Sequence, residues 1–568
     1  MTTNFLEKRW VVKPAIPKDA EVSLVGYHPV LQQLLYNRGY LTREAAQYFL
    51  DARSPNGTDP FKMIGINEAV DRIRWAIDHE ENIAVYGDYD ADGVTATALL
   101  LQSLEERGAH VRGYIPNRFD EGYGLNIDAI NNLYEQGTRL IITVDCGIRS
   151  LIEAEYANEL GLDLIISDHH HPSATLPQAV AIINPKQAQD EYPYKELAGV
   201  GLAYKLSAAL TCINKVWSEV TSEFDPYLDL VALGTVADLA PLTGENRSLV
   251  RRGLNYIRHP TRQGIMALIG VSGLRPDRID ASHIGFSLAP RLNAAGRLES
   301  ALDALNLLTT NNVQEAARLA QQLEIQNRER QLITHEIQQR AEQIVLESDP
   351  DAFLFFAADP SFNPGVVGLA ASRLCDLYYR PAIVAHLGDE FTRGSCRSIP
   401  EFHITQALDE CADLLEHHGG HSAAAGFTVH NKNLTDLVQR LKEIAANQLS
   451  EIDLRPMLQA DLEIPLADLK PELLKYLDLL QPTGIGNRQA QFVTRELRPM
   501  GVRAIGRDNA HLKFSVTDGW ITYDAIAFRQ GHWREHMPSR IDIMYTFELN
   551  EYNGRKSLQL NVRDIKSS

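Results

Sequence analysis

Residues 83–93 read Ile83-Ala84-Val85-Tyr86-Gly87-Asp88-Tyr89-Asp90-Ala91-Asp92-Gly93, and this stretch decides the fold. The apolar run at its start predicts a buried strand. The acidic segment that follows, and the helical pattern from Thr95 to Arg107, indicate that the strand leads through a loop into a helix. A strand that is apolar along its whole length is typical of a parallel sheet covered by helices on both faces.

The same order of apolar strand and acidic loop occurs twice more along the chain. Leu140–Val144 is a predicted strand that leads into Asp145, and Leu164–Ile166 is another that leads into Asp168-His169-His170. Val180–Ile183 is a possible fourth strand. Because open parallel sheets bind ligands at the carboxyl ends of their strands, we expect these acidic and imidazole side chains to converge there.

The converging side chains would be five carboxylates and two imidazoles, namely Asp88, Asp90, Asp92, Asp145, Asp168, His169 and His170. Without cations they would repel and desolvate one another. Mixed oxygen and nitrogen ligands suit Mn²⁺ and tolerate Mg²⁺. So many carboxylates indicate two divalent ions, which can clamp the attacking and leaving oxygens of a phosphoryl displacement.

Other interpretations exist for each of these residues taken singly. An Asp after a buried strand is often a helix N-cap or a turn residue. Asp-x-Asp-x-Asp-Gly also resembles the start of a calcium loop, but the position that such a loop fills with Glu is Leu99. Asp238, near the end of an apolar helix, is either a further metal ligand or the partner of an arginine such as Arg251.

These elements resemble the motifs of the DHH phosphoesterase superfamily, and Asp168-His169-His170 is the motif that gives it its name. Flanking segments resemble its RecJ branch: 87–93, 199–201, 232–238 and 289–297. Gly419–Gly426 is similar to the associated DHHA1 domain. The resemblance covers nearly the whole chain.

Patterning and resemblance together predict an α/β multidomain protein. We expect an N-terminal cap segment (1–60), a parallel-sheet DHH phosphoesterase catalytic domain (61–308), a long connecting helix (309–347), an α/β DHHA1 domain (348–450) and a C-terminal β-rich, OB-like domain that binds single strands (451–568). The connecting helix is predicted because 311–346 has apolar residues at helical spacing and no Gly or Pro.

The expected C-terminal domain has strands around two turns, Asp518-Gly519 and Asn553-Gly554. From Arg488 to Lys566 it has thirteen Lys and Arg against nine Asp and Glu. Aromatic residues lie among these charges, which is typical of an OB-fold that stacks single-stranded bases, although about half of such aromatics belong to the core. They are Phe492, Phe514, Trp520, Tyr523, Phe528, Trp533, Tyr545 and Tyr552.

The resemblance implies two metal ions, Mn²⁺ or Mg²⁺. One would be held by Asp88 or Asp90 with Asp145, and the second by Asp92, His169 and Asp238, with Asp145 bridging the two. It further implies that Asp168 orients His169 and that His170 contacts the scissile phosphate.

The DHHA1 half is expected to contact phosphate and the DNA strand. Ser395 and Arg397 offer a hydroxyl and a guanidinium as an anion cradle, and His421 could reach the reacting phosphate. Asn363 opens a helix, although the family usually carries Trp-His where this chain has Phe362-Asn363.

In the segment that joins the halves, Arg291, Asn293 and Arg297 are candidates for binding the 5′ terminal phosphate. A structural ion pair is the alternative for the arginines.

The composition of the chain limits how it can bind DNA and in which compartment it is expected. The net charge of −19 argues against wrapping duplex DNA with the whole surface, but leaves room for a local basic channel. Five scattered cysteines with no CxxC pair fit a reducing, cytoplasmic interior and exclude a zinc ribbon. No secretory signal and no membrane-spanning apolar run is visible.

The function implied by the resemblance is a single-stranded-DNA-specific 5′→3′ exonuclease that releases 5′-mononucleotides in DNA repair and recombination. It would act as a monomer beside a single-stranded-DNA-binding protein and a helicase. The alternatives are another DHH phosphoesterase acting on short oligonucleotides or RNA, and a non-catalytic replication factor that retains the fold.

Overall fold

The computed structural model describes residues 6–52, 58–117, 124–212, 227–298, 300–552 and 555–568. It consists of two compact units, each described here by itself. The smaller unit combines Met1–Val11 with Ile325–Leu458, and the larger one combines Val12–Glu324 with Gln459–Ser568. Among the described residues, no helix has both the length and the apolar character needed to cross a membrane.

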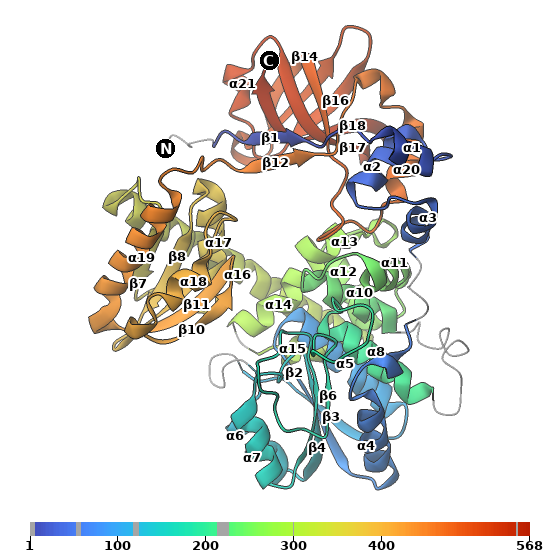
Figure 1. Ribbon diagram of the computed structural model, residues 1–568, viewed down its shortest axis with the longest axis vertical. Helices are drawn as coiled ribbons and strands as arrows, with labels where there is room; N and C mark the ends of the chain where they lie inside the picture. The colour runs from blue at the N-terminus through green and yellow to red at the C-terminus, as the bar shows by residue number, and fades with distance from the viewer. Residues whose placement is uncertain (1–5, 53–57, 118–123, 213–226, 299, 553–554) are drawn as a thin grey trace. The chain divides into compact units, whose positions relative to one another are not determined.

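The larger unit contains the predicted parallel sheet (Figure 1), in the strand order β3-β2-β4-β5-β6. Every neighbouring pair is parallel. The strands are β2 (Asn82–Gly87), β3 (His110–Tyr114), β4 (Thr138–Val144), β5 (Asp163–Ser167) and β6 (Ala181–Ile183). Strand β3 was not predicted, because it lies at the edge of the sheet and its sequence, His-Val-Arg-Gly-Tyr, has no apolar run.

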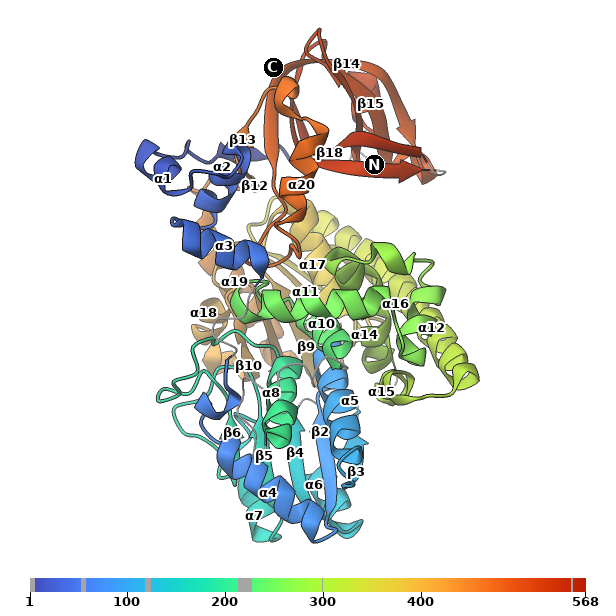
Figure 2. The ribbon, with the colours of Figure 1, turned by 90° about the vertical axis from the view of Figure 1, so that its right-hand side faces the viewer.

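Helices cover both faces of this sheet, which explains the continuous apolar strands (Figure 2). Ile83 and Val85 belong to a core shared with α4 (Ile66–Asp78), α5 (Ala91–Glu105) and α8 (Gly199–Thr211). Ala84 and Tyr86 belong to the core on the opposite face, with α6 (Ile127–Glu135) and α7 (Leu151–Glu159).

A helical region follows the sheet. Helix α10 (Leu228–Ala237) is buried from Leu228 to Val236, as expected of a helix that is apolar on nearly every side. The long predicted helix is α16 (Val313–Ser348), and the boundary between the two units falls within it. The other helices are α11 (Gly244–Arg258), α12 (Gln263–Val271), α13 (Ala281–His283), α14 (Ala289–Leu298) and α15 (Leu302–Thr309).

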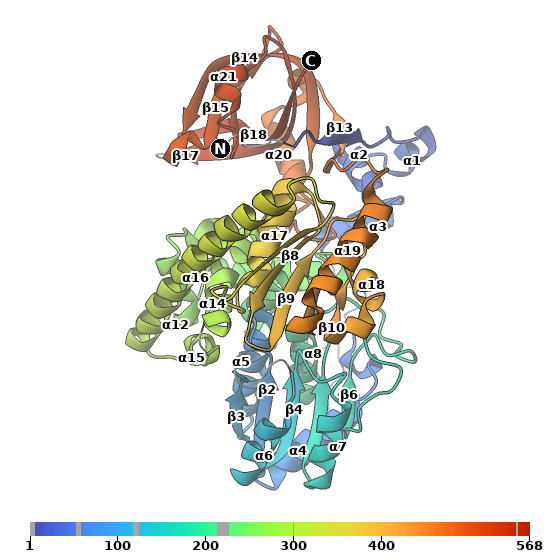
Figure 3. The same cartoon turned by 90° about the vertical axis from the view of Figure 1, so that its left-hand side faces the viewer.

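The smaller unit has a mixed five-stranded sheet in the order β10-β11-β9-β8-β7 (Figure 3). Strands β7 (Phe355–Asp359) and β8 (Ala382–Leu387) are parallel. The antiparallel strands are β9 (Phe391–Arg397), β10 (Leu415–His421) and β11 (Ala424–His430). Its helices are α17 (Val367–Tyr378), α18 (Ile404–Asp409) and α19 (Leu434–Leu449).

The C-terminal strands form a barrel in the order β13-β14-β15-β16-β18-β17, closed by pairing of β14 with β17. The predicted turn at Asp518-Gly519 joins β15 to β16, whereas Asn553-Gly554 lies outside the described residues. The strands are β13 (Leu462–Glu463), β14 (Phe492–Ile505), β15 (His511–Thr517), β16 (Thr522–Ala527), β17 (Ile541–Tyr552) and β18 (Arg555–Ser567).

The N-terminal helices share one core with this barrel: Leu31 and Leu34 pack in the same cluster as Leu466 and Phe492. The helices involved are α2 (Pro29–Asn37), α3 (Arg43–Asp51) and α20 (Pro471–Asp478), and Leu24 joins the core directly after α1 (Lys18–Ser23). Thus the first segment of the chain completes the last domain.

The predicted barrel aromatics are divided between the core and the surface. Phe492, Phe514 and Tyr545 are core residues. Tyr523 and Trp533 are half-buried, and the side chain of Tyr552 lies outside the described part of the structure. Trp520 is 95% exposed and Phe528 49% exposed, so these two rings are accessible to a ligand.

Candidate active site

The loop after β2 is held by backbone donors. Asp90 is the N-cap of α5, and its Oδ1 accepts hydrogen bonds from Asp92 N (2.8 Å) and Gly93 N (3.1 Å). Both oxygens of Asp92 accept from the first turn of α8, from Gly199 N (2.7 Å) and Val200 N (2.8 Å). The helix-cap interpretation therefore holds for Asp90, and these bonds fix the direction of the acidic loop.

Asp145 follows β4 in a left-handed conformation, with φ 64°, and is buried. Backbone strain of this kind is found mainly where the surroundings impose it at functional sites. The neighbouring helix approaches so closely that a Cβ on Gly199 would lie 2.8 Å from the Cβ of Asp145. This close approach explains the first glycine of Gly199-Val200-Gly201.

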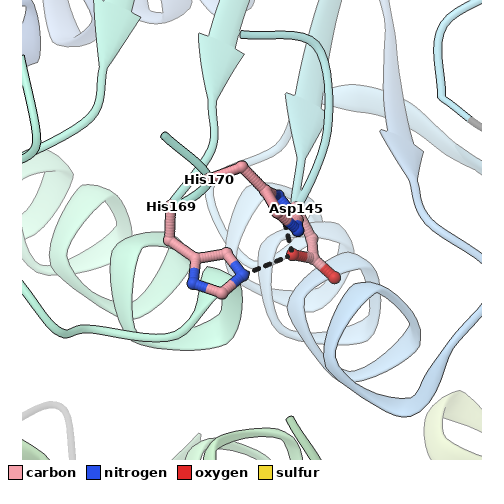
Figure 4. A group of neighbouring side chains, drawn as sticks. All are labelled: Asp145, His169 and His170. Atoms are coloured by element: carbon pink, nitrogen blue, oxygen red, sulfur yellow. Dashed lines mark ion pairs between the residues drawn. The ribbon is translucent and has the colours of Figure 1, made fainter. Parts of the chain in front are cut away.

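Both histidines lie beside the carboxylate of Asp145 (Figure 4), and His169 is also near two further carboxylates. The Nε2 of His169 lies 3.0 Å from Asp145 Oδ1, 3.8 Å from Asp238 Oδ2 and 4.0 Å from Asp92 Oδ2. His170 Nδ1 lies 4.0 Å from Asp145 Oδ1. Asp238, at the C-terminal end of α10, therefore belongs to the cluster, whereas Arg251 donates to the carbonyl of Leu50.

The expected pairing of Asp168 with His169 is wrong, because Asp168 pairs with His170 instead. Asp168 Oδ1 accepts from the backbone N of His170 (3.0 Å) and lies 2.7 Å from its Nδ1. Asp168 Oδ2 accepts from Ile148 N (3.0 Å). The Asp carboxylate turns back to its own chain two residues on, as in an Asx turn, and this orients the second histidine rather than the first.

Burial strongly perturbs the pKa values of the carboxylates. The pKa of Asp92 is raised to about 7 by burial and by the charge of Asp90, and that of Asp238 to about 9 by burial and by Asp92. The pKa of Asp145 is well above its ordinary value, again through burial first and neighbouring carboxylates second. In the absence of cations the cluster therefore favours protons on these oxygens.

The two histidines are shifted in opposite directions. Burial, followed by the charge of His170, lowers the pKa of His169 to about 3, so its ring is neutral and suited to metal ligation. Burial alone would lower the pKa of His170, but its hydrogen bond to Asp168 and the charges of Asp168, Asp88 and Asp92 together outweigh burial and raise it. Burial would likewise raise the pKa of Asp168, and the bonds from His170 leave it lowered.

The donor set fits divalent ions. Three groups of ligand atoms each lie within 4.8 Å of one another: Asp88, Asp90 and Asp145; Asp92, His169 and Asp238; Asp145, His169 and His170. Asp145 Oδ1 and His169 Nε2 are buried and make no hydrogen bond, although only 3.0 Å separates them. Two buried ligand atoms at this distance without a hydrogen bond are the arrangement expected of ligands that share a cation.

Two site residues were missed by sequence reasoning, and both follow β6. Asn184 Nδ2 donates to the carbonyl of His170 (2.8 Å), and Asn184 Oδ1 accepts from Lys186 N (2.8 Å). Burial is the main cause of the pKa shifts of His169 and Asp238, and the charge of Lys186 acts on both as a smaller effect, adding to the first shift and opposing the second. Both residues directly follow the possible fourth strand at 180–183, and this position at the carboxyl end of a parallel strand could have identified them.

Two of the three candidate residues in the segment joining the halves make structural contacts. Arg291 Nε forms an ion pair with Glu324 Oε2 (2.7 Å), and its Nη1 donates to the carbonyl of Ser287 (2.6 Å). Asn293 Oδ1 accepts from Ala91 N (2.7 Å) and so helps to hold the acidic loop. Arg297 lies in the last turn of α14 and is partly buried.

The remaining predicted residues belong to the smaller unit. Asn363 Oδ1 accepts from Gly365 N (2.8 Å) just before α17. A Cβ on Gly368 of that helix would lie 3.1 Å from Arg397 Nη2 and 3.5 Å from Ser395 Oγ, so the start of the helix faces these side chains. His421 is exposed at the end of β10.

Comparison with known protein families matches three models along the chain. The DHH family N-terminal domain matches residues 82–235, the DHHA1 domain residues 351–447, and the RecJ OB domain residues 460–564.

Individual relatives match over most of the chain. The single-stranded-DNA-specific exonuclease RecJ of Bacillus subtilis is 42% identical, covering 95% of this chain and 68% of the relative. That of Escherichia coli is 34% identical, covering 94% and 96%. The crystal structure of RecJ in complex with Mn²⁺ from Thermus thermophilus superposes with a TM-score of 0.84 at 28% identity, over 99% of this chain and 80% of the other. On this evidence the chain belongs to the RecJ family of the DHH phosphoesterases.

Proposed function

We propose that the chain is a metal-dependent exonuclease that hydrolyses single-stranded DNA in the 5′→3′ direction to 5′-mononucleotides, in DNA repair and recombination. The observation that carries the proposal is the largely buried cluster of Asp and His side chains at the carboxyl ends of β2, β4 and β5. The named activity of the relatives supports the substrate, and family resemblance supplies the polarity.

Two divalent cations fit the ligand groups. Asp88, Asp90 and Asp145 would hold one ion, and Asp92, His169 and Asp238 the other. Relatives have been solved with Mn²⁺ and with Mg²⁺, which supports either ion. When bound, the ions would neutralise the carboxylates, activate water and stabilise the charge that develops on the phosphate.

His170 would contact the scissile phosphate. Asp168, whose pKa is lowered, accepts the hydrogen bond from His170 Nδ1. The Nε2–H of His170 would donate to a phosphate oxygen of the bound strand, and the raised pKa of the ring favours the cationic form that binds an anion.

Other contacts extend the proposal. Ser395, Arg397, His421 and Asn363 would contact the phosphates of the strand, and Arg297 the 5′ terminal phosphate. The exposed rings of Trp520 and Phe528 offer surfaces on which bases stack. We further propose a cytoplasmic monomer that acts with a single-stranded-DNA-binding protein and a helicase; family resemblance alone supports this.

The test is digestion of end-labelled single strands by the wild type and by Asp145→Asn. Removing a ligand common to two of the three groups is expected to lower turnover at least about a thousandfold, while leaving DNA affinity within about threefold, because electrostatic strand contacts dominate binding. A chelator should abolish wild-type activity and Mn²⁺ should restore it. Asp351→Asn, at an exposed position of the smaller unit, is the matched control.

Full turnover by Asp145→Asn would refute the metal assignment. Release of the 3′ label first would refute the polarity. Faster hydrolysis of a dinucleotide or of RNA than of long single-stranded DNA would favour the alternative phosphoesterases.

A further inference from the structure

The residue after the cluster carboxylate Asp238 has an unusual backbone. Leu239 has φ 61°, and its N–H donates to the carbonyl of Val236 (3.2 Å), while Ala240 N donates to Thr235 O (3.2 Å). This pair of bonds is a Schellman motif that ends α10, and its left-handed position is usually occupied by glycine. Among the described residues, Leu239 is the only branched aliphatic residue at positive φ.

Neither the conformational preference of leucine nor burial of its side chain explains why leucine occupies position 239. A Cβ in the left-handed conformation crowds the following carbonyl, so leucine is less stable than glycine at this position. Packing does not offset that strain, because Leu239 is 65% exposed. A strained residue that remains exposed is best explained by an interaction with a ligand.

The position of Leu239 suggests what that ligand is. Its Cα is about 3.8 Å from that of Asp238, whose Oδ2 lies 3.8 Å from His169 Nε2. Leu239 is therefore an exposed apolar residue directly beside a ligand of a cluster that consists of carboxylates and imidazoles. A nucleotide whose phosphate occupies the cluster has one large apolar surface, the face of its base.

We propose that Leu239 is a substrate-contacting residue that packs against a nucleobase flanking the scissile phosphate. This inference rests on the proposed metal-dependent hydrolysis at the cluster. The strained Schellman turn holds the side chain in place before the substrate arrives, so that less conformational freedom is lost on binding. Because any base has an apolar face, the contact would hold the strand without reading its sequence.

Leu239→Gly tests the proposal, because it relieves the strain and removes the side chain together. We expect its melting temperature to rise, its Mn²⁺ affinity to stay unchanged, and its KM for single-stranded DNA to rise about five- to tenfold with kcat nearly constant. Leu239→Met, which keeps an apolar side chain, is the matched control and should retain most of the wild-type KM.

Substrates with an abasic site locate the contact. If a base adjacent to the scissile bond packs on Leu239, wild type and Leu239→Gly should have the same KM on a strand whose first or second nucleotide is abasic. The proposal would be overturned if Leu239→Gly raised KM equally on normal and abasic strands, or if it left KM unchanged on normal strands. Failure of the wild type to degrade DNA with Mn²⁺ would instead overturn the proposed function.

Discussion

At the scale of single residues, protons and cations compete for the same oxygens. Burial, followed by the charge of Asp90, raises the pKa of Asp92 to about 7. Burial, followed by the charge of Asp92, raises the pKa of Asp238 to about 9. A divalent ion must displace these protons, so its affinity should increase with pH. In the metal-free protein, by contrast, the stability that these two carboxyl groups contribute should decrease as pH rises.

A carboxyl group whose pKa is raised by folding contributes stability at low pH, and this contribution is lost as pH rises through the folded-state pKa. In chelator, the melting temperature of Asp238→Asn should therefore increase relative to wild type between about pH 6 and about pH 9, because the neutral amide avoids the buried charge. Thermal melts at the two pH values measure the difference.

The same melts with saturating Mn²⁺ provide the control. Wild type should then be the more stable protein at pH 9, because the variant lacks one ligand. Identical differences in melting temperature at both pH values, with and without Mn²⁺, would show that Asp238 is not part of a metal site.

At the scale of secondary-structure elements, close helix packing places the cluster. A Cβ on Gly234 of α10 would lie 2.2 Å from Thr95 Oγ1 and 2.8 Å from both Asp92 Oδ1 and Val200 Cγ1. Helix α10 thus crosses α5 and α8 beside Asp92, and glycine permits this approach. The segment Ala232–Asp238 is constrained by packing at Gly234 and by the cluster at Asp238.

Gly234→Ala should therefore destabilise the fold, although alanine normally stabilises a helix interior relative to glycine. We expect a loss of about 1–3 kcal/mol of unfolding free energy from overpacking, with weaker Mn²⁺ binding because Asp92 must shift. Denaturant unfolding and metal titration measure both effects. Gly270→Ala in α12 is the control: its added Cβ meets nothing within 4 Å, so stability should be unchanged or slightly higher.

At the scale of the whole molecule, one buried arginine joins three parts of the larger unit. The guanidinium of Arg247, on α11, donates to backbone carbonyls of the α3 helix and of the segment that follows α20. The acceptors are Phe49 (3.1 Å), Leu479 (2.9 Å), Leu480 (2.7 Å) and Pro482 (3.0 Å). Burial, followed by the charge of Arg251, lowers its pKa to about 10, so it remains charged at neutral pH.

Arg247→Met should leave these carbonyls without their donor while filling much of the same volume. We expect a loss of about 3 kcal/mol or more in unfolding free energy, and faster proteolysis in residues 479–487. Arg318→Ala removes an exposed ion pair with Glu315, and it should change neither the unfolding free energy nor the rate of proteolysis. Equal stability of Arg247→Met and wild type would mean that this contact does not hold the parts together.

Most of the cluster could be predicted from the sequence because buried strands and the residues that follow them are local features. The apolar runs at 83–86, 140–144 and 164–166 became β2, β4 and β5, and Asp88, Asp145 and His169 lie at their ends. Strand β14 was not predicted, because Pro499, Gly501 and several charges interrupt its apolar pattern and only pairing with β15 and β17 stabilises it.

The sequence by itself determined the parallel α/β architecture and the acidic and imidazole ligands, because both follow from the order of residues along each strand and loop. Tertiary structure alone decided that Asp168 orients His170, that Asn184 and Lys186 border the site, and that the first helices complete the last domain. Those outcomes depend on distances between segments far apart in the chain or on the exact path of a turn, and residue order does not specify either.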